Sequence, residues 1–185
     1  MLKKWVFLLS LIPLFLSACS GGLVNYSSNR PVDLCSRMAV IPFSNHTETP
    51  LAGERAMSIA AALLESRGIY HLAVYQNQFQ GKMLFPGMNQ VVSQKTLLIW
   101  ARSTEARYAL TGSVNEWSYK VGLDGEPVVG LSLQLINLRT EDIVWTAVGS
   151  LSGGSRTAVS TVAQELLNSM LDGLLSTRHD LCPQI

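Results

Sequence analysis

The strongest constraint on the fold comes from the last part of the chain. Between residues 159 and 175, apolar side chains recur at spacings of three and four, which places them on one side of an α-helix. A stripe of this kind is stable only where another apolar surface covers it. Its members are Val159, Val162, Ala163, Leu166, Leu167, Met170, Leu171, Leu174 and Leu175. We therefore expect this helix to pack against a sheet or another helix.

Three predicted strands directly upstream supply a surface to cover the stripe. Apolar and polar residues alternate from Tyr108 onward, and the phase slips at Glu116, which predicts a β-bulge. Two further strands are predicted at 128–139 and 142–152, after a turn at 122–127. Because short turns join these strands, they should form an antiparallel meander.

The first half of the domain alternates strands with helices. Strands are predicted at 38–43 and 71–76, and a long loop at 77–92. Thr49 and Pro50 fit the start of a helix that Gly68 ends, and Ser93 fits the cap of a helix reaching about Ala106. The order β-α-β-α-β-β-β-α predicts an α/β fold, in which flanking helices and a mixed sheet form two or three layers.

The start of the chain has the parts of an export signal. Two lysines precede an apolar run at 5–16, and small residues then lead to Cys19. The run has about a dozen residues where a membrane-spanning helix needs about 20, which disfavours the alternative of an uncleaved anchor. Residues 16–19 resemble a bacterial lipobox, which implies that Cys19 carries acyl chains of the palmitate type. We predict a signal peptide at 1–18, a lipidated tether at 19–34 and a single periplasmic α/β domain at 35–185.

Charge and cysteine content narrow the class of protein. Without residues 1–18 the chain has 12 basic and 13 acidic residues, which gives no electrostatic case for nucleic acid. The charge is uneven, because residues 52–107 hold six basic and three acidic residues, while residues 116–142 hold two basic and five acidic residues.

Two cysteines, Cys35 and Cys182, remain once Cys19 is lipidated. An oxidising periplasm favours a disulfide between them over two free thiols.

No pattern in the sequence predicts a reaction. His46, His71 and His179 lack metal-ligand spacing, and neither a nucleophile elbow nor a phosphate-binding loop is present. We therefore expect a protein that is not an enzyme and that has no metal and no cofactor. Trp117 and Trp145 fall in the predicted meander, where core packing is the usual role, and contact with membrane or a second subunit is the alternative.

Two segments carry a resemblance to known periplasmic domains. Residues 38–47 (MAVIPFSNHT) and 108–114 (YALTGSV) resemble strands of the N-terminal domain of TolB and its relatives. A narrower likeness runs over about residues 35 to 176. Residues 45–55, 116–120 and 125–131 are similar to PelC, an outer-membrane lipoprotein of Pel exopolysaccharide export, a biofilm polymer system.

The PelC resemblance implies a role in transport. It implies a homo-oligomeric ring, a dodecamer, on the periplasmic face of the outer membrane, where Ser20 after the lipid site also places the chain. The ring would be a funnel that guides a cationic, partly deacetylated amino-sugar polymer to the β-barrel of an export partner. Acidic side chains repeated around the ring would sum into a strong negative potential at its inner surface. The basic helical side of each subunit would contact a neighbouring subunit or lipid headgroups. The candidate polymer-facing residues are Asp124, Glu126, Glu141 and Asp142.

A regulatory role is the alternative. Some outer-membrane lipoproteins of this fold activate a peptidoglycan synthase or another envelope complex by protein contact, and they need a long arm to reach it. The arm predicted here, about residues 20–34, spans at most about 50 Å when fully extended. Its shortness favours a domain held close to its own membrane.

Overall fold

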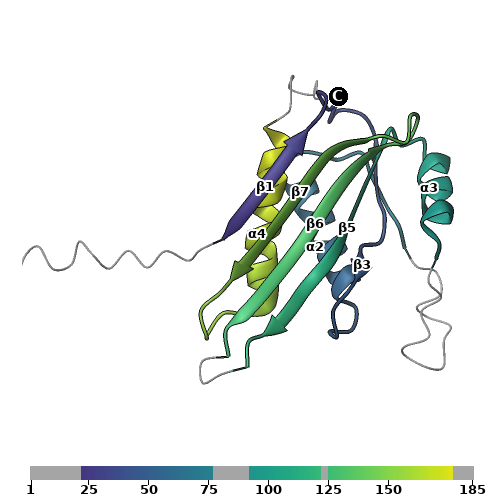
Figure 1. The fold of residues 1–185 in the computed structure, drawn as a ribbon. Coiled ribbons are helices and arrows are strands. Elements are labelled where there is room, and N and C mark those ends of the chain that lie inside the picture. The colour runs from purple at the N-terminus through teal and green to yellow at the C-terminus, as the bar shows by residue number, and fades with distance from the viewer. Residues whose placement is uncertain (1–21, 77–91, 122–124, 177–185) are drawn as a thin grey trace, which may run out of the picture.

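The computed structural model describes residues 22–76, 92–121 and 125–176, which build one mixed sheet with helices on both faces (Figure 1). The described strands are β1 (Leu23–Ser28), β2 (Met38–Val40), β3 (Ser44–Asn45), β4 (Leu72–Val74), β5 (Tyr108–Tyr119), β6 (Pro127–Asn137) and β7 (Ile143–Ser152). The described helices are α2 (Ala52–Ser66), α3 (Gln94–Ser103) and α4 (Val159–Leu175).

The strands lie in the order β1-β7-β6-β5-β2-β4, and short β3 pairs with β5 beside this path. Strands β5, β6 and β7 form the predicted antiparallel meander, whereas β2 is parallel to both β4 and β5. The predicted α/β fold with a mixed sheet is confirmed. The predicted element order also holds, with β1 and β3 as additions.

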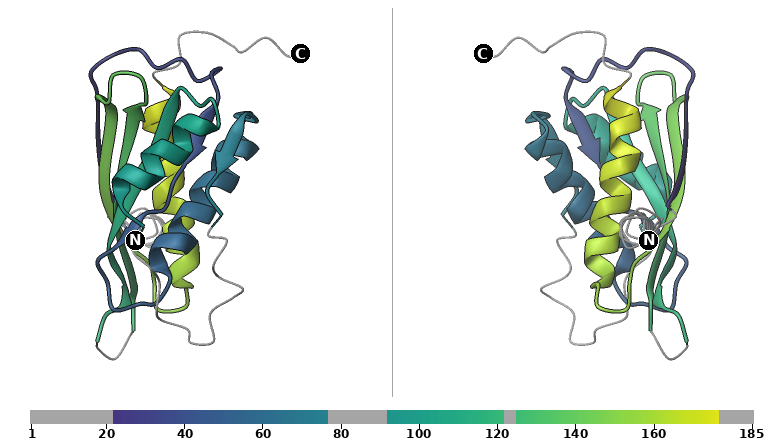
Figure 2. Two further views of the ribbon diagram at one scale, coloured as in Figure 1. Left: turned by 90° about the vertical axis from the view of Figure 1, so that its right-hand side faces the viewer. Right: turned by 90° about the vertical axis from the view of Figure 1, so that its left-hand side faces the viewer.

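Alternating residues of β2 divide the core between the two sheet faces. Met38 and Val40 belong to the larger core, which α2 and α4 cover, and the stripe predicted on α4 is buried there. Ala39 and Ile41 face the opposite way and pack with Leu97 and other residues around α3. Helices therefore cover both sheet faces in three layers. Figure 2 shows α4 and α2 together on one side of strands β5, β6 and β7. No helix in the described part of the chain has both the length and the apolar character needed to cross a membrane.

Two of the three predicted capping signals, those at Gly68 and Ser93, are confirmed. The Gly68 N–H donates to Glu65 and the Ile69 N–H to Leu64, a Schellman motif with Gly68 at φ 85°. The Ser93 hydroxyl accepts the Thr96 N–H at 3.2 Å and caps α3.

The predicted Thr49 cap is wrong. Helix α2 begins at Ala52, after Leu51 in the left-handed conformation. The Thr49 hydroxyl instead donates to the Trp117 carbonyl oxygen of β5 at 2.6 Å. A contact between distant segments thus replaced the local cap that the sequence suggested.

The predicted bulge in β5 is confirmed, since its pairing with β6 shifts between Val114 and Glu116. Beyond the bulge, Trp117 points into the core and Tyr119, on the same face, reaches α4, where its hydroxyl oxygen accepts the Val159 N–H. The loop predicted at 77–92 and the turn at 122–127 lie largely outside the described residues.

The tether predicted at 19–34 is wrong over residues 23–28. These residues form β1, which pairs antiparallel with β7 over six positions (Leu23 with Ser150 through Ser28 with Trp145). Tyr26 packs on α4 at Gly173, where an added Cβ would lie 2.6 Å from the tyrosine ring. Most side chains of β1 are exposed, so its main-chain pairing left little trace in the hydrophobic pattern.

Candidate functional site

The predicted acidic residues lie in two groups at opposite ends of the sheet. Glu126 precedes β6, whereas Glu141 and Asp142 lie in the turn after it. An 11-residue strand such as β6 is about 33 Å long, so no single subunit brings these groups together. Asp124 lies outside the described residues.

Each described member of this acidic set has a cationic partner. The pairs are Glu126 with Lys120 at 3.7 Å, Asp142 with Arg30 at 3.9 Å, and Glu141 with Arg102. All are largely exposed, so each pair contributes about 0–1 kcal/mol to stability. More importantly, the lysine or arginine in each pair offsets the negative electrostatic potential of its carboxylate. Their role as polymer-facing residues stays a prediction.

A fourth carboxylate, Asp33, organises the turn that leads into β2. The Ser36 hydroxyl donates to it at 2.6 Å, the Cys35 N–H donates at 3.1 Å, and Arg107 lies at 2.9 Å. The Ser36 hydrogen bond, with help from Cys35 and Arg107, holds the pKa of Asp33 below its usual value. The stability from these contacts is present at neutral pH and is lost as the pH falls through the lowered pKa.

Trp117 and Trp145 do not form a membrane or subunit surface in this structure. Their side chains are 2% and 1% exposed and belong to the core under α2 and α4. Neither indole nitrogen has a hydrogen-bond partner among the described residues. The alternative of lipid or subunit contact is therefore wrong, because the pairing register places Trp117 beside Val129 and Trp145 beside Leu135 in the same core.

Of the predicted disulfide pair, only Cys35 belongs to the described residues. It lies in the Asp33–Ser36 turn and is disulfide-bonded. Cys182 and the lipidation candidate Cys19 lie outside the described residues, so the pairing and the anchor stay predictions. Among the described residues, no group of three His, Cys, Asp or Glu side chains could hold a metal ion.

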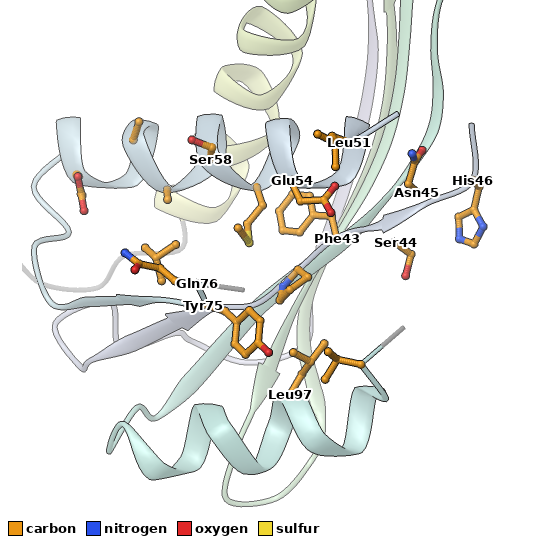
Figure 3. A pocket seen from close by; sticks show the side chains of 17 residues that line it. Phe43, Ser44, Asn45, His46, Leu51, Glu54, Ser58, Tyr75, Gln76 and Leu97 are labelled. Atoms are coloured by element: carbon orange, nitrogen blue, oxygen red, sulfur yellow. The ribbon is translucent and has the colours of Figure 1, made fainter. Parts of the chain in front are cut away.

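A cleft of about 1020 Å³ lies between α2 and α3 (Figure 3). Residues 42–46, which follow β2, and residues 74–76 at the end of β4 form its floor. Helix α2 forms one wall and Leu97 of α3 belongs to the other. Figure 3 shows the Glu54 carboxylate and the Tyr75 ring directed into the space between the helices. Tyr75 is held from behind by an edge-on contact with Trp100, at 5.0 Å between ring centroids.

The cleft has a negative lining. Glu54 and Glu65 both line it, and no lysine or arginine does so in the described part of the chain. Neither glutamate makes an ion pair with another described residue. His46 stands at one side, and the remaining lining residues are apolar or neutral.

The topology explains why a cleft forms at this place. Strands β2 and β4 are parallel neighbours, and the chain leaves β2 through α2 on one face and β4 through α3 on the other. Open α/β sheets bind ligands in the crevice beyond the carboxyl ends of such strands. No hydrogen bond joins a nucleophile to a base among the described lining residues, and the lining offers shape and negative charge for binding.

The sequence did not predict this cleft, because its residues come from four separate segments that share no motif. One signal was available. Polar residues lie within a few positions of the ends of both short strands, as Ser44-Asn45-His46 after β2 and as Gln76 after β4, and the ends of parallel strands meet at one edge of a sheet.

No protein-family model matches the chain, and no curated protein matches its sequence. Solved structures do match. The PelC dodecamer of Paraburkholderia phytofirmans is 36% identical, covers 86% of this chain over its own full length (100%) and superposes with a TM-score of 0.70. A dodecamer of a PelC variant from the same organism is 37% identical, with 82% of this chain and 98% of that chain covered and a TM-score of 0.67.

A more distant structure shows the fold alone. A lipoprotein of Neisseria meningitidis is 16% identical, covers 76% of this chain and 99% of its own, and superposes with a TM-score of 0.51. Sheet and helices of this kind therefore recur in a lipoprotein of quite different sequence.

Proposed function

Because this chain belongs to the PelC family, we propose that it is an outer-membrane lipoprotein whose copies form a periplasmic ring. The ring would guide a cationic exopolysaccharide to an export barrel. The observation that carries the proposal is 36% identity over 86% of the chain to a dodecameric PelC. Identity at this level over a whole domain preserves the core and supports a shared mode of assembly.

The position of β1 supports attachment close to a bilayer. Leu23 is already paired with Ser150, so only residues 20–22 separate the sheet from the predicted lipid on Cys19. Four residue steps extend to at most about 14 Å. This is far shorter than the arm that the regulatory alternative requires, and it favours a domain that stays at its own membrane.

The same strand supports one orientation of the sheet relative to the predicted anchor. Leu23 pairs near the end of β7, where Ser152 pairs with Val128 of β6. In the proposed orientation, the Glu126 end of the sheet therefore lies nearer the lipid, and the Glu141–Asp142 end lies farther out in the periplasm. A polymer that enters the ring from the periplasm would therefore reach the Glu141–Asp142 end before the Glu126 end.

Transport requires that each contact with the polymer is weak. A conduit must bind its cargo favourably enough to admit it and loosely enough to release it. Carboxylates repeated around a ring meet this need, because they sum into a field that concentrates a cationic chain without a deep pocket for any one unit. Such a role needs no catalytic group.

Deletion of the chain from a bacterium that encodes it is expected to abolish secretion of the amino-sugar polymer. Wild-type protein should restore secretion, and Cys19→Ser protein should remain in the soluble periplasmic fraction and restore it poorly. The measurement is the amount of polymer outside and inside the cells. Unchanged secretion by the deletion strain would refute the proposal, and full rescue by a soluble Cys19→Ser protein would refute the role of the anchor.

A further inference from the structure

We propose that the cleft between α2 and α3 binds an extended segment of a cationic amino-sugar chain, so that each subunit has its own polymer subsite. This inference rests on the proposed function and adds to it a definite location. It also moves the principal polymer contact from the hairpin ends to the α2–α3 cleft.

Two carboxylates without a cationic partner line the cleft. The described acids at the hairpin ends each face a lysine or arginine, whereas Glu54 and Glu65 have no ion-pair partner among the described residues. Arg55 of α2 is exposed and does not line the cleft, and Arg67, which directly follows α2, is paired elsewhere. Arg67 lies 2.9 Å from Asp172 of α4 and donates to Asn168. The two glutamates are therefore free to meet the ammonium groups of a ligand.

The spacing of the two glutamates selects an extended ligand. They are eleven positions apart in the sequence, which is about three helical turns, so they share one side of α2 and lie about 16 Å apart along its axis. A ligand that contacts both must span this distance and carry at least two positive groups. A chain of amino sugars does so, and a single small cation does not.

The rest of the lining suits a sugar ring. Pro42, Phe43 and Leu97 give apolar surface, and the Tyr75 ring is directed into the cleft. Sugar rings present C–H groups on their faces, which pack on aromatic and aliphatic side chains, and hydroxyl groups at their edges. Ser58 and Gln76 supply polar partners for those hydroxyls. No described lysine or arginine lines the cleft, so its described lining favours a cationic ligand over an anionic one.

The test is binding of a glucosamine hexamer to the mature lipoprotein in detergent micelles, measured by isothermal calorimetry at low salt. The variant Glu54→Gln/Glu65→Gln should weaken binding about tenfold, since each exposed charge contact contributes a few-fold. The matched control is Glu105→Gln/Glu165→Gln, which removes two exposed glutamates outside the cleft and should bind as wild type does. The fully N-acetylated hexamer, which lacks ammonium groups, should bind at least tenfold more weakly than the glucosamine hexamer.

A second variant tests the cleft without changing either glutamate. Ser58 is exposed on α2 and lines the cleft, so Ser58→Arg adds a cation there and should reduce hexamer binding to a similar extent. Native mass should be unchanged in all variants, which shows that assembly is intact.

The possible outcomes distinguish a failure of the cleft assignment from a failure of the proposed function. If both cleft variants bound the hexamer as tightly as the wild type does, the cleft would not be the binding site, and the proposed function would still stand. Equal binding of the acetylated hexamer would overturn recognition by charge. No binding by the wild-type protein at millimolar hexamer would overturn both the cleft and the guiding role.

Discussion

Replacing Trp145 with alanine is expected to lower the free energy of unfolding by about 3–5 kcal/mol. The ring is 1% exposed and lies in the core under α2 and α4, on a β7 position paired with Leu135 of β6. Its removal would leave a cavity that the flanking strands cannot close, because they are held by pairing on both sides. Trp145→Phe should cost less, since it keeps most of the volume and removes an indole N–H that has no described partner.

Urea unfolding followed by circular dichroism measures this effect, at one protein concentration because assembly shifts apparent stability. Val148→Ala is the control, since Val148 is on the same strand but its side chain is largely exposed. A change within about 0.5 kcal/mol is expected for it. If Trp145→Ala left stability unchanged and instead reduced binding to vesicles, the core assignment of this ring would be wrong.

Replacing Gly53 with alanine is expected to destabilise the domain by about 2–3 kcal/mol, although alanine favours a helix interior by about 1 kcal/mol. A Cβ on Gly53 would lie 2.2 Å from the Phe43 carbonyl oxygen, which is backbone and cannot rotate away. Helix α2 would have to move from the segment that follows β2. This segment is also the floor of the cleft, so binding of the glucosamine hexamer should fall as well.

The control for this prediction is Gly154→Ala. The nearest neighbour of an added Cβ there is the Thr157 hydroxyl at 4.0 Å, an ordinary contact, so stability should hardly change. Thermal unfolding of both variants beside the wild type gives the comparison. A Gly53→Ala protein as stable as wild type would show that α2 does not approach the chain as closely as described.

Elements whose burial follows a simple period were predictable from the sequence. The stripe of α4 and the meander with its bulge at Glu116 were identified from spacing alone, because one side of each element is buried along its whole length. The Ser93 cap and the Gly68 end were also predictable, since each depends on a local hydrogen bond.

Features that depend on distant contacts were not predictable in this way. Strand β1 is defined by its main-chain pairing with β7, which side-chain patterns do not show. Thr49 fitted a local cap but bonds to β5 instead. The inward direction of Trp117 and Trp145 follows from strand register, which one sequence does not give. The cleft combines residues from α2, α3 and two strand ends, so only the fold brings them together.

The central claim is that copies of this chain assemble into a ring and pool their negative charge around one passage. Native mass spectrometry of the mature lipoprotein in detergent micelles tests it most directly. We predict one defined high-mass species, a dodecamer like that of the PelC of Paraburkholderia phytofirmans, with no ladder of intermediate sizes. A mass that remained that of a single subunit at every concentration, and also on lipid vesicles, would contradict the account.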